Sequence, residues 1–177
     1  MKKLVFAFSA VILCLLISCA DSKNEGGLSA KAKKNLENSE AIAKMFEKAD
    51  FSKAGDHIAA DAVDHSGPQG EVKGLDAMMA MFKQFSEMST DAKNEIVQEL
   101  ADDNYSMMWL KQSWTAKVDD PMMRMKAGDH GNMESIEVCK HNADGKITDH
   151  WSFISMADMM KMMPQQQMPT TDTTKAK

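Results

Sequence analysis

The sequence predicts a single α+β domain in which N-terminal helices pack on one face of an antiparallel sheet of about four strands. Apolar residues recur every three or four positions up to residue 85, which is a helical period, and the period changes to two after Thr90. Turn-forming clusters separate the alternating segments, and no internal repeat is visible. The 177 residues suffice to close one core without metals or disulfides.

Two segments carry the helical period. Residues 35–50 have an apolar stripe with acidic residues between its members, and Gly55 interrupts it. Residues 56–60 indicate a short second helical turn, and residues 66–70 form a loop by composition. A further helix begins near Gly74, and its apolar positions are Leu75, Met78, Met79, Phe82 and Phe85.

Four later segments carry the strand period, namely residues 92–100, 105–118, 133–141 and 146–154. A hairpin turn over residues 142–145 joins the last two. Residues 156–163 return to a helical spacing that Pro164 ends, and the polar residues 164–177 are predicted to be a disordered tail.

The N-terminus has the pattern of an export signal. Lys2 and Lys3 precede an apolar run that is too short for a comfortable membrane span. The residues Leu16-Ile17-Ser18-Cys19 resemble the bacterial lipoprotein box, which implies that residues 1–18 are removed and that Cys19 is lipidated. Residues 19–34 are then the lipidated cysteine and a flexible tether, and the protein is anchored in the cell envelope, with the outer membrane as the expected site. An ordinary signal peptide with an incidental cysteine is the alternative.

Composition excludes several classes of function. The formal net charge is −5, and no Lys/Arg cluster exists beyond Lys31–Lys34, so a nucleic-acid partner is not expected. The mature chain would retain only Cys19 and Cys139, so no disulfide framework is expected, and Cys139 is predicted to be a buried, inert thiol. Zinc-ligand spacing, phosphate-binding loops and dinucleotide fingerprints are missing, so we expect no cofactor and no resident metal.

Methionine is the one unusual count, with 18 Met against 9 Leu. Clusters such as Met122-Met123-x-Met125 and Met159-Met160-x-Met162-Met163 would suit Cu(I), which prefers soft sulfur ligands, with His130, His141 and Met168 as further candidates. The clusters are spread over helix, strand and loop, however, and methionine more often replaces leucine as core filler. Cu(I) binding is therefore an alternative function.

Two motifs resemble the SnoaL-like polyketide cyclase branch of the nuclear transport factor 2-like superfamily. They are Asp61-Ala62-Val63-Asp64-His65, with Gly74 opening a helix, and the string DGKITDHW at residues 144–151. The resemblance covers residues 35–163. It implies a cone-shaped domain whose curved antiparallel sheet wraps the helices around a pocket for a small, largely apolar molecule, and it makes a homodimer through the sheet face a further expectation.

The resemblance also implies where chemistry would occur. It places His150 and Trp151 near the pocket mouth and Asp64 and His65 opposite them, so His150 is the candidate general base while Asp64 and His65 position or polarise the substrate. The alternative is that both histidines only hydrogen-bond neighbouring backbone in a non-catalytic binding module.

Three further residues bear on the site. Glu137 is either an internal carboxylate with a raised pKa or a solvent-facing strand residue, and Trp109 belongs to the core or the pocket wall. Ser155 stands where cyclases usually carry an acid after the His-Trp pair. A serine hydroxyl is too weak a base to replace that acid, so aldol chemistry is not expected to carry over.

Overall fold

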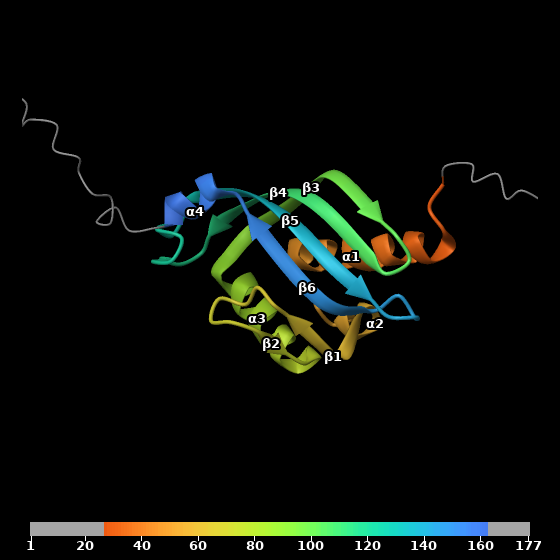
Figure 1. Ribbon diagram of the computed structural model, residues 1–177. Helices are drawn as coiled ribbons and strands as arrows, with labels where there is room; N and C mark the ends of the chain where they lie inside the picture. The colour runs from red at the N-terminus through yellow and green to blue at the C-terminus, as the bar shows by residue number, and fades with distance from the viewer. Residues whose placement is uncertain (1–26, 163–177) are drawn as a thin grey trace, which may run out of the picture.

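The computed structural model describes residues 27–162, and it confirms the α+β class (Figure 1). In chain order the elements are α1 (Ala30–Lys48), α2 (Ala54–His57), β1 (Ile58–Asp64), β2 (Val72–Lys73), α3 (Leu75–Met88), β3 (Ser89–Ala101), β4 (Tyr105–Ala116), β5 (His130–His141), β6 (Ile147–Ile154) and α4 (Met156–Met162). The signal, Cys19 and the polar tail lie outside the described residues. Within residues 27–162, no helix combines the length and apolar character that crossing a bilayer requires.

The described strands form one six-stranded sheet in the order β2-β1-β6-β5-β4-β3. Strands β3 to β6 form the predicted antiparallel meander, whereas β1 lies parallel to β6 and β2 pairs antiparallel with β1. The sheet curves over α1, which crosses one of its faces, while α3 packs near β1 and β2 (Figure 1). We call the helix-covered face the inner face and the opposite one the outer face.

Strand β1 corrects the sequence prediction, which placed a helical turn at residues 56–60. The helix α2 ends at His57, and the chain is extended from Ile58. The residues of β1 lack a clean alternation because Ile58 and Ala59 are both buried, so a period of two was not visible. Its partner β6 is more than 80 residues away in sequence, with Asp64 opposite His150.

Helix α1 begins earlier than predicted, so residues 30–34 are helical and do not belong to a flexible tether. Ser29 caps it by accepting a hydrogen bond from the Ala32 N–H at 3.0 Å. The buried side of α1 is largely polar: Asn35 donates to the Asp102 carbonyl at 2.9 Å and Asn38 to the Gly145 carbonyl at 2.6 Å. These bonds fix α1 against two turns of the sheet.

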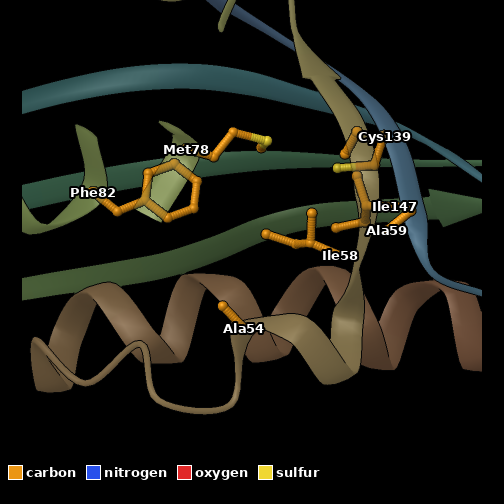
Figure 2. Packing of buried hydrophobic residues seen from close by; sticks show 8 residues of the cluster. Ala54, Ile58, Ala59, Met78, Phe82, Cys139 and Ile147 are labelled. Carbon is orange, nitrogen blue, oxygen red and sulfur yellow. The ribbon is translucent and has the colours of Figure 1, made fainter. Parts of the chain in front are cut away.

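The apolar core lies between α3, β1 and the strands β5 and β6 (Figure 2). Its buried members are Ala54, Ile58, Ala59, Ala62, Met78, Phe82, Cys139 and Ile147. Phe82 meets the rings of Phe46 and Phe51 at centroid distances of 4.8 and 5.7 Å. Cys139 is buried as predicted, and burial raises the pKa of its thiol to about 12, so the thiol is inert at neutral pH.

Candidate functional site

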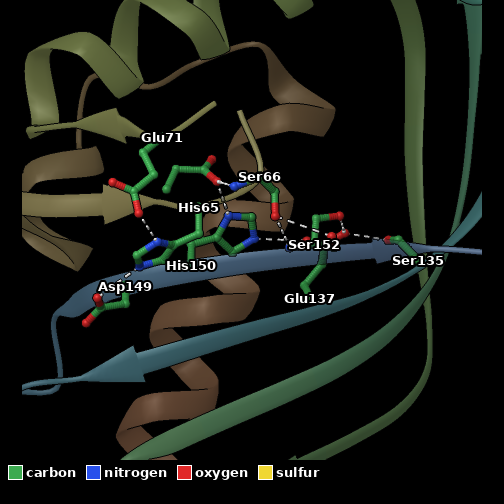
Figure 3. Close-up of polar contacts among 9 residues, drawn as sticks. His65, Ser66, Glu71, Ser135, Glu137, Asp149, His150 and Ser152 are labelled. Carbon is green, nitrogen blue, oxygen red and sulfur yellow. Dashed lines mark hydrogen bonds and ion pairs between the residues drawn. The ribbon is translucent and has the colours of Figure 1, made fainter. Parts of the chain in front are cut away.

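The end of β1 and the middle of β6 bring three sequence-predicted residues together on the inner face. Asp64 is the last residue of β1 and lies opposite His150, while Glu137 of β5 lies opposite Ser152 of β6. Because alternate residues of a strand face opposite sides, His150, Ser152 and Glu137 share the inner face (Figure 3). We call Asp64, His150 and Glu137 the inner triad.

The imidazole of His150 lies between the two carboxylates. Its Nε2 is 2.9 Å from Glu137 Oε2, and its Nδ1 is 3.3 Å from Asp64 Oδ1, without the alignment of a full hydrogen bond. Burial opposes the charged imidazole, but the contacts with Asp64 and Glu137 outweigh it and raise the pKa of His150 to about 9. His150 is therefore an imidazolium at neutral pH.

Glu137 is an internal carboxylate. Its Oε1 accepts hydrogen bonds from the hydroxyls of Ser135 and, at 3.0 Å, of Ser152, while Oε2 faces His150. The side chains of the triad remain partly open, with 14% of Glu137, 22% of His150 and 5% of Asp64 exposed. A small molecule on the inner face can therefore reach Glu137 and His150 more readily than Asp64.

The carboxylate of Asp64 is fixed from two sides. The Ser66 N–H donates to Oδ1 at 2.8 Å, and His150 approaches the same oxygen. Burial works against ionisation here, but the contacts with His150 and the Ser66 N–H together lower the pKa of Asp64. Asp64 is thus an anion that balances part of the imidazolium charge.

His65 does not join the inner triad. It follows Asp64 directly and therefore points to the outer face, where Nδ1 lies 2.9 Å from Glu71 Oε1 and Nε2 lies 3.2 Å from Asp149 Oδ1. Its ring stacks on Trp151 at a centroid distance of 4.7 Å and an interplanar angle of 8°. The predicted site pair of Asp64 and His65 is thus divided between the two faces.

Both tryptophans predicted to contact a ligand lie on the outer face, away from the inner triad. Trp151 alternates with His150 in β6, so it cannot share the inner face. Trp109 is 42% exposed and its indole N–H donates to Glu134 Oε2 at 3.2 Å. In their place, Trp114, Met133 and Ile154 are half-buried on the inner-face positions of β4, β5 and β6.

A polar hollow of about 390 Å³ opens where α4 meets β4 and β5. Gln112 and Met133 line it, together with Asp158 and Lys161 of α4. Ser135 Oγ donates its one proton to Glu137 and lies 3.4 Å from Gln112 Oε1, so a chain of polar contacts runs from this hollow through Ser135 to Glu137. Ser135 and Glu137 are two residues apart in one strand and so share a face, a relation that the sequence alone could have shown.

Ser155 has a structural role. Its hydroxyl accepts the Asp158 N–H at 3.0 Å and donates to Asp158 Oδ2 at 2.8 Å, which caps α4. Ser155 therefore supplies no acid to the site. The acid that faces His150 is Glu137 of the neighbouring strand β5.

Methionines occupy both core and surface positions. Met78 and Met108 are buried, whereas Met122, Met159 and Met160 are exposed. In residues 27–162, no three His, Cys, Asp or Glu side chains gather in a way that would hold a metal ion.

The model of one protein family, described as SnoaL-like polyketide cyclase, matches residues 38–165. The chain belongs to the SnoaL-like polyketide cyclase family. No sequence among curated proteins matches this member of the family.

Solved structures share the fold of this SnoaL-like chain at low sequence identity. TsrD from Streptomyces laurentii is 12% identical with a TM-score of 0.63, and the match covers 77% of this chain and 97% of that one. A SnoaL-like polyketide cyclase from Agrobacterium tumefaciens is 15% identical with a TM-score of 0.59, covering 72% and 95%. An LEH-like epoxide hydrolase from M. tuberculosis is 14% identical with a TM-score of 0.60, covering 75% and 86%.

Proposed function

We propose that this SnoaL-like domain binds a small, largely apolar molecule on its inner face and exchanges protons with it through the inner triad. The observation that carries this proposal is the imidazole of His150, both of whose ring nitrogens face carboxylates. The half-buried Trp114, Met133 and Ile154 support an apolar ligand body.

The triad offers an acid and a base side by side. An imidazolium with a pKa of about 9 donates protons at neutral pH, so we assign His150 the role of general acid in place of the base expected from sequence. The carboxylate of Glu137 is the group that can accept a proton. Cyclisation and epoxide hydrolysis, named for two of the structural neighbours, both need such proton transfers.

The test is turnover of a panel of small epoxides and cyclisable ketones by purified protein, followed by mass spectrometry. For any probe that turns over, Glu137→Gln and His150→Asn are expected to lower kcat/KM by about 100-fold or more, as loss of general acid–base catalysis does. His130→Asn is the matched control, because His130 is exposed on β5 and contacts Thr115 rather than the triad. Unchanged rates in both triad variants would contradict the proposal.

A binding module without catalysis is the second candidate. It is favoured by Glu137, both of whose oxygens are already engaged by Ser135, Ser152 and His150. Polar groups that the protein holds in place in this way orient a ligand rather than react with it. Native mass spectrometry that finds a bound molecule, together with Glu137→Gln weakening retention and no turnover, distinguishes this function from catalysis.

Cu(I) binding is a third candidate because Met122, Met159 and Met160 are 61%, 42% and 51% exposed and so are not core filler. Competition against a coloured Cu(I) chelator measures it. Met159→Leu with Met160→Leu is expected to weaken uptake, while Met107→Leu on the outer face leaves it unchanged; equal uptake by all variants rules out this site.

We also propose that Cys19 carries the lipid that anchors the domain. Cys19 precedes the helix cap Ser29 by ten residues, a stretch that spans at most about 35 Å, so the domain would stay close to the membrane. Cys19→Ala is expected to abolish labelling by radioactive palmitate and to release the protein from membranes. Labelling that persists in the variant contradicts the anchor.

A homodimer through the outer face completes the proposal. Met107, Trp109, Ile136 and Phe153 are exposed there, and Trp109 and Phe153 both lie opposite Ile136 in the sheet register. Contiguous apolar patches of this kind mark protein interfaces. Light scattering is expected to give a dimer for the wild type and a monomer for Trp109→Lys, with Met122→Lys as the control; a monomeric wild type overturns this part.

A further inference from the structure

Two of the four Asp-His dipeptides in the sequence lie side by side in the sheet. Asp64-His65 ends β1, and Asp149-His150 lies in β6, with Asp64 opposite His150 in the parallel register. Strand alternation sends His150 inward and His65 and Asp149 outward (Figure 3), and Asp64 faces His150 on the inner side. The result is two reciprocal cross-strand pairs, the inner at 3.3 Å and the outer at 3.2 Å.

The outer pair is held by more than Asp149. Glu71 lies 2.9 Å from the other ring nitrogen of His65, and Trp151 covers the face of the ring. A neutral imidazole has only one N–H, so both carboxylates are bonded only when His65 is protonated. The contacts with Asp149 and then Glu71 accordingly raise the pKa of His65, and Lys73 and Lys140 are the cations that approach these carboxylates.

The backbone links the two pairs. The His65 N–H donates to the His150 carbonyl at 2.9 Å, and the Ser66 N–H donates to Asp64 Oδ1 at 2.8 Å. Ser66 Oγ in turn accepts the Ser152 N–H at 2.7 Å. The ladder pairs Asp64 with His150, and beyond the end of β1 the hydrogen bonds of His65 and Ser66 continue the contact with β6.

We propose that His65 is a positioning residue: by bridging Asp149 and Glu71 on the outer face, it holds the end of β1 on β6 and so keeps Asp64 beside His150 Nδ1. The importance of this positioning for chemistry rests on the proposed function of the inner triad, but the positioning itself does not.

Titration of the His150 imidazole by NMR in purified full-length protein tests the inference. His65→Phe retains a flat ring for Trp151 and removes both N–H donors. Loss of a neighbouring cation alone would raise the pKa of His150, whereas withdrawal of Asp64 lowers it, so the two effects have opposite signs. We expect a fall of about one pH unit, because a nearby opposite charge shifts a pKa by about 1–3 units. An unchanged or raised pKa overturns the inference.

Three further variants complete the experiment. His65→Gln keeps an amide donor and is expected to give His150 a pKa between those of the wild type and His65→Phe. If His65→Phe does not fold, His65→Gln alone tests the inference, and an unchanged pKa of His150 in that variant contradicts it. His130→Phe is the control and should leave His150 unchanged. Asp64→Asn is expected to lower the pKa of His150, and an unchanged pKa would refute the inner triad itself. A lower pKa in Asp64→Asn but not in His65→Phe would refute only the positioning role of His65.

Discussion

At the scale of single residues, the buried histidine His141 shows how a neighbour decides a protonation state. Its Nδ1 is 2.9 Å from the Gly145 carbonyl, which can only accept, so Nδ1 carries the proton. Its Nε2 therefore accepts from the Ser106 hydroxyl at 2.8 Å, and Ser39 donates to Ser106 at 2.7 Å. Burial lowers the pKa of His141, the opposite of His150, because no carboxylate faces it in these contacts.

This network makes Ser106→Ala a sharp test. The change leaves His141 Nε2 buried without a donor, and a stranded acceptor costs about 1–3 kcal/mol. We expect the free energy of unfolding in urea to fall by that amount. Ser113→Ala, at an exposed position of the same strand, is the control, and equal losses in the two variants would show that the network adds nothing.

At the scale of elements, one glycine makes room for a tryptophan ring where β4 pairs with β5. Trp114 lies opposite Gly131, and a Cβ at Gly131 would come within 2.4 Å of the indole ring. The ring can therefore lie flat across β5 only because residue 131 has no side chain.

Gly131→Ala is expected to displace Trp114 and to destabilise the protein by about 1–3 kcal/mol, as overpacking does. A shift in tryptophan fluorescence and a lower urea midpoint measure the effect. Gly128→Ala does not isolate the same effect, because Gly128 has a positive φ of 92°. Asn132→Ala, next to Gly131 and exposed, is the better control, and an unshifted emission spectrum in Gly131→Ala would contradict the contact.

At the scale of the whole molecule, His150 and His141 lower the free energy of unfolding at opposite ends of the pH range. The folded state raises the pKa of His150 to about 9 from 6.5, so this stabilisation is complete below pH 6.5 and is lost as pH rises toward 9. His65 acts in the same direction. His141, with a lowered pKa, stabilises above pH 6.5 and loses its contribution as pH falls.

We therefore expect the free energy of unfolding to be greatest near pH 6.5 and to fall on both sides. Urea unfolding between pH 5 and pH 9.5 measures it, and His150→Asn should flatten the alkaline limb while leaving the acid limb in place. The lowered pKa values of Asp64 and Asp149 act only at lower pH, below their usual range. A stability that stays constant from pH 6.5 to pH 9.5 would contradict the assigned state of His150.

Local patterns in the sequence account for α3 and the four meander strands. Their periods of 3.6 and 2 reflect which side of each element is buried, and that signal lies within the element itself. The turn before β6 is equally local: Asn142 Oδ1 accepts the N–H groups of Asp144 and Lys146, and Gly145 takes a φ of 79°. The burial of Cys139 followed from the same alternation.

Only the tertiary structure decided β1 and the composition of the site. β1 is a strand because β6 supplies its ladder from across the chain, a contact that no local pattern in residues 58–64 records. Asp64-His65 and Asp149-His150, two of the four Asp-His dipeptides in the sequence, are identical as dipeptides, and each contains one candidate acid and one candidate base. They become an inner pair and an outer pair because the parallel register joins Asp64 to His150, and the pleat then sends His65 and Asp149 to the other face.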